Sequence, residues 1–325
     1  MKALICGISG QDGAYLARHL LEQGYEVIGT SRDAQMNPFD KLKRLGLLER
    51  VAFDSMSLSD FRSVMQTLMR HEPDEVYNLA GQSSVGLSFE QPGRTYDSIM
   101  GGTLNLLEAI RLLKRPIRLY NAGSGECFGE SPDGGATELD AFRPRSPYAV
   151  AKAAAFWQVA NYREAYGLFA CSGILFNHES PLRPARFVTR KVVSAAARIK
   201  NGSDEKLMLG NLDVARDWGA AQEYVVAMHR MLTRDQAADF VIATGEVNSL
   251  EQFVETAFEL AGLDWKDHVE VDKSLYRPTD IRRGFGRPDK AARDLNWKAS
   301  LHMREVIDGM LKAELEESPT FSSET

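Results

Sequence analysis

Tyr148 and Lys152 lie four positions apart in a segment that predicts a helix, so their side chains project from one face. An ammonium group beside a phenol lowers its pKa, which makes Tyr148 a candidate general base for a sugar hydroxyl. Ser124 follows a strand-like run and is a candidate hydrogen-bond partner of the reacting hydroxyl. Glu126, two residues further on, could remove a proton from a carbon next to a ketone. These four residues are the catalytic candidates.

A glycine-rich turn follows the first strand-like run and precedes a helical pattern. Its sequence, Gly7-Ile8-Ser9-Gly10-Gln11-Asp12-Gly13, has the spacing G-x-x-G-x-x-G. Glycines let the backbone turn tightly and approach a pyrophosphate, whose charge rests on the N-terminus of the helix. The turn therefore predicts a dinucleotide site that includes Gln11 and Asp12.

The end of the second strand-like run distinguishes between two dinucleotides. An acidic residue there binds the ribose hydroxyl of NAD, whereas an arginine accommodates the extra phosphate of NADP. Arg32 favours NADP, while Asp33 would either repel that phosphate or pair with Arg32. We therefore expect NADP, with NAD as the less favoured alternative.

The elements that must position these residues alternate along the first 180 residues. Strand-like apolar runs occur at 3–6, 26–30, 51–53, 75–80, 117–122 and 169–176, with helical patterns at 15–22, 61–70 and 103–113 between them. Such alternation predicts an α/β fold with a Rossmann-type doubly wound parallel sheet. We expect residues 1–176 plus about 220–245 to form this domain. A smaller, discontinuous α/β substrate domain would take about 177–219 plus 246–316, followed by a frayed tail at 317–325.

Composition excludes several classes of protein. The chain has 325 residues, 39 Lys plus Arg and 45 Asp plus Glu, hence a formal charge of −6, and 44% hydrophobic residues. These values exclude wholesale disorder and disfavour the basic surface that nucleic acid or an anionic membrane requires. The three cysteines are scattered, the six histidines lack metal-ligand spacing, and no apolar run reaches the roughly 18 residues of a membrane span. A soluble cytoplasmic protein without a metal site is expected.

With these motifs in place, the chain resembles the extended short-chain dehydrogenase/reductase superfamily, and longer runs are similar to the GDP-mannose 4,6-dehydratase family over nearly the whole length. The runs that carry the narrower resemblance are Tyr77-Asn78-Leu79-Ala80-Gly81-Gln82-Ser83, Pro144-Arg145-Ser146-Pro147-Tyr148, Phe176-Asn177-His178-Glu179-Ser180-Pro181, Phe187-Val188-Thr189-Arg190-Lys191 and Arg216-Asp217-Trp218-Gly219, together with the glycine-rich turn.

The resemblance implies conversion of GDP-mannose to GDP-4-keto-6-deoxymannose by a self-contained redox cycle. Tyr148 would deprotonate O4 while C4 gives hydride to NADP+, and Ser124 would polarise the C4 oxygen. Glu126 would take the C5 proton and help water leave from C6, to which the hydride returns. A homodimer or homotetramer is implied as well.

The resemblance also assigns binding residues. Those implied for the cofactor, besides the glycine-rich turn, Arg32, Tyr148 and Lys152, are Leu79, Ala80, Gln82, His178 and Arg183. Those implied for the GDP-sugar are Ser83, Asn177, Val188, Lys191, Arg216, Arg277 and Asp280. Arg186 and Arg190 belong to the same basic run but are expected on a solvated helix face.

Several positions depart from the family pattern. Ser124 stands for threonine and Asp280 for glutamate, both keeping the functional group, while Asp33 replaces an arginine and Ser57 an acidic residue. Gly125 replaces serine and is expected to enlarge the pocket. Ile99 replaces the Asn or Asp usual in extended enzymes, which would alter the water network behind Lys152.

Other functions stay open on the sequence alone. A dehydratase of another GDP-sugar, such as a GDP-manno-heptose, would suit a pocket enlarged at Gly125. A GDP-4-keto-6-deoxyhexose reductase would have no need of Glu126, and a non-catalytic NADP-binding regulator would have no need of Tyr148 and Lys152.

Overall fold

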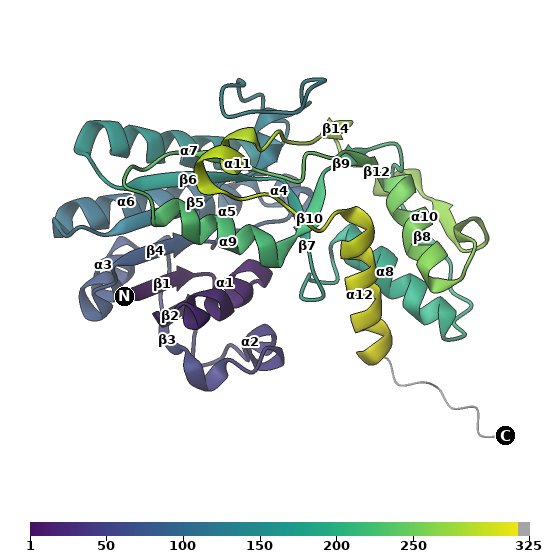
Figure 1. Cartoon of the computed structure of the whole chain (residues 1–325), viewed down its shortest axis with the longest axis horizontal. Coiled ribbons are helices and arrows are strands. Elements are labelled where there is room, and N and C mark those ends of the chain that lie inside the picture. Colours follow the sequence, from purple (N-terminus) through teal and green to yellow (C-terminus); the bar gives the residue numbers. More distant parts are fainter. Residues whose placement is uncertain (318–325) are drawn as a thin grey trace.

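The computed structural model describes residues 1–317 and is built around one large parallel sheet (Figure 1). Its seven strands lie in the order β11-β6-β5-β4-β1-β2-β3, and every neighbouring pair is parallel. Their bounds are β1 Lys2–Cys6, β2 Glu26–Ser31, β3 Ala52–Ser55, β4 Glu75–Asn78, β5 Arg118–Ala122, β6 Ala170–Leu175 and β11 Phe240–Ile242. The central strands are buried on both faces, which explains their continuous apolar runs. The predicted doubly wound sheet is confirmed.

Helices cover both faces of this sheet. The helices of this part of the molecule are α1 Gln11–Glu22, α2 Asp40–Arg44, α3 Phe61–His71, α4 Val85–Glu90, α5 Pro92–Tyr96, α6 Gly102–Leu113, α7 Pro147–Tyr166 and α9 Ala221–Leu232. Leu16 of α1 and Met228 of α9 share one buried cluster, whereas Leu68 of α3, Ile110 of α6 and Val159 of α7 share another. Thus α1 and α9 cover one face, and α3, α6 and α7 cover the other.

A smaller α/β layer lies beside one end of the large sheet (Figure 1). Its elements are β7 Asn177–Glu179, α8 Val188–Lys200, β8 Leu207–Leu209, β9 Ala215–Arg216, β10 Trp218–Ala220, β12 Asn248–Ser249, α10 Leu250–Ala261, β13 Val269–Val271, β14 Arg283–Gly284 and α12 Met303–Glu317. Helices α8, α10 and α12 pack against one another around Val192, Phe253 and Ile307. Ser249 and Gln252 form a reciprocal capping box that begins α10.

One segment lies elsewhere than the sequence suggested. Helix α11 (Asp289–Leu295) packs against α9 and β11, and Leu295 and Trp297 belong to the core under the large sheet. The indole nitrogen of Trp297 donates to the carbonyl oxygen of Glu223 at 2.9 Å. Residues 289–299 therefore pack with the Rossmann-type layer, although the sequence pattern places them in the substrate domain.

Arg190 of α8 also departs from expectation. Its guanidinium contacts Glu314 of α12 and the carbonyl oxygen of Pro181, with only 13% of its side chain exposed. It is therefore not on a solvated face; it joins α8 to α12. The predicted tail at 317–325 lies outside the described residues, apart from Glu317. Up to that residue, no helix combines the length and apolarity needed to cross a membrane.

Candidate active site

A cleft of about 460 Å³ opens at the carboxyl ends of the large sheet, where the two layers meet. Ligands of open α/β sheets bind at such a place. The predicted residues that line it are Asp12, Leu79, Ser83, Ser124, Glu126, Tyr148, Lys152, Asn177, His178, Arg183, Val188, Lys191, Arg216, Arg277 and Asp280. The remaining predicted residues, Gly7, Gly10, Gln11, Gly13, Arg32, Ala80 and Gln82, lie outside its walls, in the segments that follow β1, β2 and β4.

The glycine-rich turn before α1 is packed too closely for side chains at Gly7 and Gly13. Gly7 has φ +83°, and a Cβ there would lie 2.9 Å from the Cα of Ala80. A Cβ on Gly13 would lie 2.6 Å from the carbonyl oxygen of Gly7. Gly10 precedes α1 and offers no side-chain cap, so the first amides of the helix can bind an anion. The turn fits a dinucleotide pyrophosphate.

Asp12 and His178 form an ion pair across the cleft floor. Oδ2 of Asp12 lies 2.9 Å from Nε2 of His178, whose Nδ1 lies 2.7 Å from the carbonyl oxygen of Phe176. Burial opposes ionisation, but His178 lowers the pKa of Asp12 to about 2, and Asp12 in turn raises the pKa of His178. Gln11 donates to Asp12 at 3.0 Å and to the carbonyl oxygen of His178 at 3.1 Å. This network ties the glycine-rich turn to β7.

The loop after β2 separates the roles of Arg32 and Asp33. Oδ1 of Asp33 accepts the backbone amides of Gln35 and Met36, each at 3.1 Å. Arg32 is exposed, and within residues 1–317 no side-chain hydrogen bond or ion pair engages its guanidinium. Asp33 is thus occupied by its own loop rather than by Arg32. Beyond this loop, Nζ of Lys41 donates to the carbonyl oxygen of Ser9 at 3.1 Å, a contact that no motif in the sequence indicated.

The catalytic candidates come together from β5 and α7. Ser124 precedes the short helix η3 (Gly125–Phe128), and its Oγ accepts the amide of Glu126 at 3.3 Å. Helix α7 begins with Ser146, whose Oγ accepts the amide of Ala149 at 3.1 Å. All four predicted residues, Ser124, Glu126, Tyr148 and Lys152, line the cleft together.

Lys152 is fixed beneath Tyr148. Its Nζ donates to the carbonyl oxygen of Ala122 at 2.7 Å and lies 5.8 Å from the centre of the Tyr148 ring. Burial lowers the pKa of Lys152 to about 8 and raises that of Tyr148 above its ordinary value, while a polar contact with Ser124 partly opposes the rise. The expected lowering of the Tyr148 pKa is therefore wrong: burial of the phenolate is the largest effect on this group, and it raises the pKa.

Two departures from the family pattern have clear structural settings. Ile99, in the π-helical turn η2 (Asp97–Gly101), is buried in a small apolar cluster with Tyr148 and Ala151, so hydrocarbon fills the space beside α7. A Cβ on Gly125 would lie 2.7 Å from Cε1 of Phe176. Gly125 therefore does not enlarge the pocket, because the Phe176 ring occupies the space that a side chain would need.

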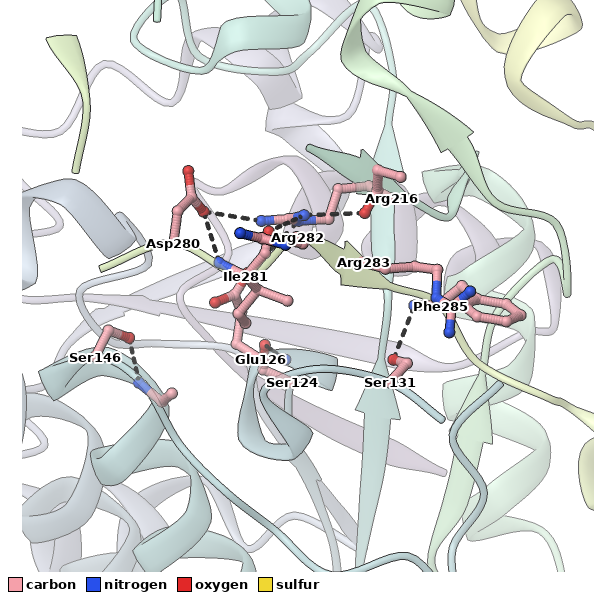
Figure 2. A network of polar contacts seen from close by, with 12 residues as sticks. Ser124, Glu126, Ser131, Ser146, Arg216, Asp280, Ile281, Arg282, Arg283 and Phe285 are labelled. Carbon is pink, nitrogen blue, oxygen red and sulfur yellow. Dashed lines mark hydrogen bonds and ion pairs between the residues drawn. The ribbon is translucent and has the colours of Figure 1, made fainter. Parts of the chain in front are cut away.

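Glu126 faces a group of charges carried by the smaller layer (Figure 2). Its Oε1 lies 4.0 Å from Nε of Arg216, and Nη2 of Arg216 lies 3.1 Å from Oδ1 of Asp280. Arg277 lies 3.6 Å from the same oxygen of Asp280. Burial raises the pKa of Glu126, although Arg216 and Arg277 act against the rise. Because burial raises its pKa, this carboxyl group takes up a proton more readily than an ordinary glutamate, as a general base and acid must.

The predicted basic residues of the smaller layer differ in how many partners their charged groups have within the protein. Arg183 pairs with Glu179 at 2.9 Å and stacks 3.7 Å above the Phe187 ring. Lys191 is exposed, and among residues 1–317 no side-chain partner engages its ammonium. Arg277 is partly exposed, and its Nη1 lies near Asp280. Lys191 and Arg277 therefore have donors to offer a diphosphate.

Some predicted residues stabilise the loops around the cleft, and further residues line it without having been predicted. Gln82 donates to the carbonyl oxygen of Ser84 at 2.8 Å and so organises the loop after β4. Sequence reasoning missed several lining residues, of which Phe176, Phe187, Trp218 and Tyr276 are aromatic. The first three lie in runs that the sequence already singles out, and Tyr276 directly precedes Arg277, which the resemblance assigns to the GDP-sugar.

Known proteins resemble this chain over nearly its whole length. The model of the family described as GDP-mannose 4,6 dehydratase matches residues 4–310. The chain is 45% identical to GDP-mannose 4,6 dehydratase 1 of Arabidopsis thaliana, covering 97% of this chain and 90% of the relative. It is 41% identical to the GDP-mannose 4,6 dehydratase of Homo sapiens, covering 97% of this chain and 91% of that protein.

Solved structures share the fold at lower identity. UDP-glucose 4-epimerase of Thermus thermophilus in complex with NAD has a TM-score of 0.85 and 26% identity, over 98% of this chain and 100% of that one. RMD of Pseudomonas aeruginosa complexed with NADPH has a TM-score of 0.80 and 24% identity, over 98% and 99% of the two chains.

Proposed function

The chain belongs to the GDP-mannose 4,6-dehydratase family, and we propose that it converts GDP-mannose to GDP-4-keto-6-deoxymannose through a bound nicotinamide cofactor. The observation that carries this proposal is the position of Glu126. Glu126 lines the same cleft as Ser124, Tyr148 and Lys152. A simple dehydrogenase or reductase needs Tyr148 as its acid–base group but has no need of a carboxyl group as a second one.

Tyr148 and Glu126 divide the proton transfers. Tyr148 takes the proton of the sugar O4 hydroxyl, which Ser124 orients, while the charged Lys152 stays beneath its ring. The bound nicotinamide supplies the hydride acceptor for C4 and the hydride donor for C6. Glu126 removes the C5 proton, which is acidic because C4 has become a carbonyl, and passes it to the oxygen that leaves C6 as water. The raised pKa of Glu126 suits it to both tasks. When C6 is reduced, C5 regains a proton, which balances the proton that Tyr148 took from O4.

For the cofactor we propose NADP. Arg32 is exposed at the end of β2, no side chain among residues 1–317 engages its guanidinium, and Asp33 is held by backbone amides. The turn at Gly7, Gly10 and Gly13 would hold the pyrophosphate. The other residues proposed for the cofactor are Gln11, Asp12, Leu79, Ala80, Gln82, Tyr148, Lys152, His178 and Arg183.

For the nucleotide sugar we propose that Lys191 and Arg277 bind the diphosphate, because they have donors to offer. Ser83, Asn177, Val188, Arg216 and Asp280 would complete the site. The proposed domain division is 1–176, about 220–245 and 289–299 for the cofactor, with the remaining residues to 316 for the sugar.

We also propose a homodimer or homotetramer in the cytoplasm. Helices α6 and α7 lie side by side and expose large apolar side chains, notably Leu104, Val150 and Trp157. Such a surface supports association through these helices. The free, buried thiols of Cys6, Cys127 and Cys171 suit a reducing compartment.

The function is tested by incubating the protein with GDP-mannose and a catalytic amount of NADP+. We expect a 4-keto-6-deoxy product without net accumulation of NADPH. Glu126→Gln should still oxidise C4 but not eliminate water, whereas Asp133→Asn, at a fully exposed acid nearby, should retain turnover. Consumption of a GDP-manno-heptose with GDP-mannose unchanged would instead establish the related dehydratase. NADPH formation in step with product would indicate a dehydrogenase.

A further inference from the structure

Arg216 is held by the protein itself. Its Nη1 donates to the carbonyl oxygens of Ala215 at 2.9 Å and Ile281 at 2.8 Å, and its Nη2 donates to Asp280 at 3.1 Å. A guanidinium has five N–H donors, so three are taken before any ligand arrives. Its side chain is only 9% exposed. The protein therefore fixes the guanidinium in one position, unlike an arginine that moves to bind a phosphate group.

The remaining face of Arg216 is turned to Glu126. Nε of Arg216 lies 4.0 Å from Oε1 of Glu126, whose side chain is 17% exposed. Figure 2 shows the order of the charged groups, with Arg216 between Glu126 and Asp280. Oδ1 of Asp280 also accepts the amide of Ile281 at 3.0 Å, which fixes the carboxylate.

The segment that carries Asp280 is bound to the loop that follows Glu126. The carboxylate of Glu130 accepts the backbone amides of Arg282 at 2.7 Å and Arg283 at 3.0 Å. Ser131 adds two bonds, since its amide donates to the carbonyl oxygen of Arg283 at 2.9 Å and its Oγ accepts the amide of Phe285 at 3.0 Å. The distance between Asp280 and Glu126 is thus built into the fold (Figure 2).

We propose that Asp280 is a positioning residue for Glu126: it holds Arg216 and shares its positive charge, and so sets how readily Glu126 keeps a proton. This inference rests on the proposed function of Glu126 and gives Asp280 and Arg216 a role besides binding nucleotide. The other ionisable groups that act on Glu126 are Arg277 from the same segment, Tyr148 from α7 and Cys127 from η3. Arg277 and Lys191 are left to bind the diphosphate.

The test is a substitution that removes the negative charge of Asp280 but keeps its side-chain oxygen as a hydrogen-bond acceptor. In Asp280→Asn, Oδ1 can still accept from Arg216 and Ile281, but the charge of Arg216 acts more fully on Glu126. We expect the midpoint of Glu126 titration to fall by about half a pH unit. Asp133→Asn is the matched control, because it removes an equal charge from the loop after Glu126 at a fully exposed position.

The titration is read directly in the full-length protein with its nicotinamide cofactor bound. Glutamate labelled with ¹³C at the carboxyl carbon is incorporated, and the Glu126 signal is identified by its loss in Glu126→Gln. A lower midpoint in Asp280→Asn but not in Asp133→Asn supports the proposal. The proposal is overturned if the Glu126 midpoint in Asp280→Asn equals that of the wild-type protein. It is also overturned if the midpoint in Asp280→Asn is higher, which would mean that Arg216 had moved away from Glu126.

Turnover of GDP-mannose gives a second reading. In Asp280→Asn, the pH at which kcat becomes half-maximal on the acidic side should fall together with the Glu126 midpoint. If this pH is unchanged and only KM for GDP-mannose changes, Asp280 acts only as a contact to the nucleotide, and the proposal is overturned. If the wild-type protein leaves GDP-mannose unchanged, the proposed function fails, while the carboxyl titration still decides the link between Asp280 and Glu126.

Discussion

The ammonium nitrogen of Lys152 lies 2.7 Å from the carbonyl oxygen of Ala122, the last residue of β5. This bond joins the second turn of α7 to the strand end that precedes Ser124, so it fixes both the ammonium and the catalytic loop. Because Lys152 is buried, its pKa is lowered to about 8. The group therefore carries its charge at neutral pH and loses it within the experimentally accessible range.

Activity should fall as pH rises through about 8, because Lys152 then loses the positive charge that lies 5.8 Å from the centre of the Tyr148 ring, where negative charge develops as O4 is deprotonated. The measurement is kcat for the 4-keto product across the alkaline range. Lys152→Met should lower kcat at neutral pH by about 100-fold or more and lose this alkaline limb. Turnover within about threefold of wild type in Lys152→Met would contradict the role of the lysine.

Arg32→Ser should weaken binding of NADP by about 10- to 100-fold, the loss expected for a charge-assisted contact with the 2′-phosphate. Binding of NAD should change little, because it lacks that phosphate. Both affinities can be measured by titration of the protein with each dinucleotide. Asp33→Asn is the control, since its Oδ1 can still accept the amides of Gln35 and Met36. An equal loss for both dinucleotides would place Arg32 outside the phosphate site.

The large sheet follows from the sequence because its strands are short, apolar and separated by helical periodicity. The catalytic candidates follow because local spacing alone puts Tyr148 and Lys152 on one helix face and Ser124 and Glu126 at one strand end. Each of these inferences needs only a few neighbouring residues, so local patterns are sufficient.

Contacts between distant segments do not follow from the sequence. Phe176 closes the space beside Gly125, and Glu130 binds the segment that follows Asp280, although each pair is far apart along the chain. Arg190 resembles a surface residue because nothing near it in sequence reveals Glu314. The direction of the Tyr148 pKa shift escapes sequence reasoning for a related reason: the burial of this phenol depends on distant residues such as Ile99.

Gly125→Ser should destabilise the protein, although serine is the residue of the family pattern. The new Cβ would lie 2.7 Å from the Phe176 ring, which must shift or the backbone must give. Overpacking of this kind lowers the free energy of unfolding by about 1–3 kcal/mol. Urea unfolding measures the change, and Phe176→Leu combined with Gly125→Ser should recover part of it. An unchanged stability in Gly125→Ser would show that the ring moves freely.

Trp157→Glu should reduce the size of the oligomer. Trp157 is 63% exposed and Val150, seven positions earlier on the same face of α7, is 41% exposed. A charge there cannot be buried in an apolar interface without a partner, at a cost of several kcal/mol. Light scattering after size exclusion measures the mass. Tyr166→Glu, at the exposed last residue of α7, is the control. An unchanged mass in Trp157→Glu would place the interface elsewhere.

Acid should destabilise the protein through a pair of histidines far from the cleft. Nε2 of His19 lies 2.9 Å from Nδ1 of His229, and Nε2 of His229 lies 3.1 Å from the Tyr25 hydroxyl. Burial and the neighbouring His19 lower the pKa of His229 from 6.5 to about 4. Between these two pH values the unfolded chain binds more protons at this site, so the free energy of unfolding falls as pH falls.

After allowance for partial solvent exposure, we expect this pair to contribute a loss of about 1–2 kcal/mol on acidification from pH 6.5 to about 4. His229→Gln keeps a polar side chain beside His19 and Tyr25 but cannot take up a proton, so its stability should depend less on pH. Urea unfolding at a series of pH values measures the slope, with His302→Gln as the control at a half-buried histidine on the smaller layer. If His229→Gln and wild type lose stability equally over this range, the acid sensitivity arises from other groups.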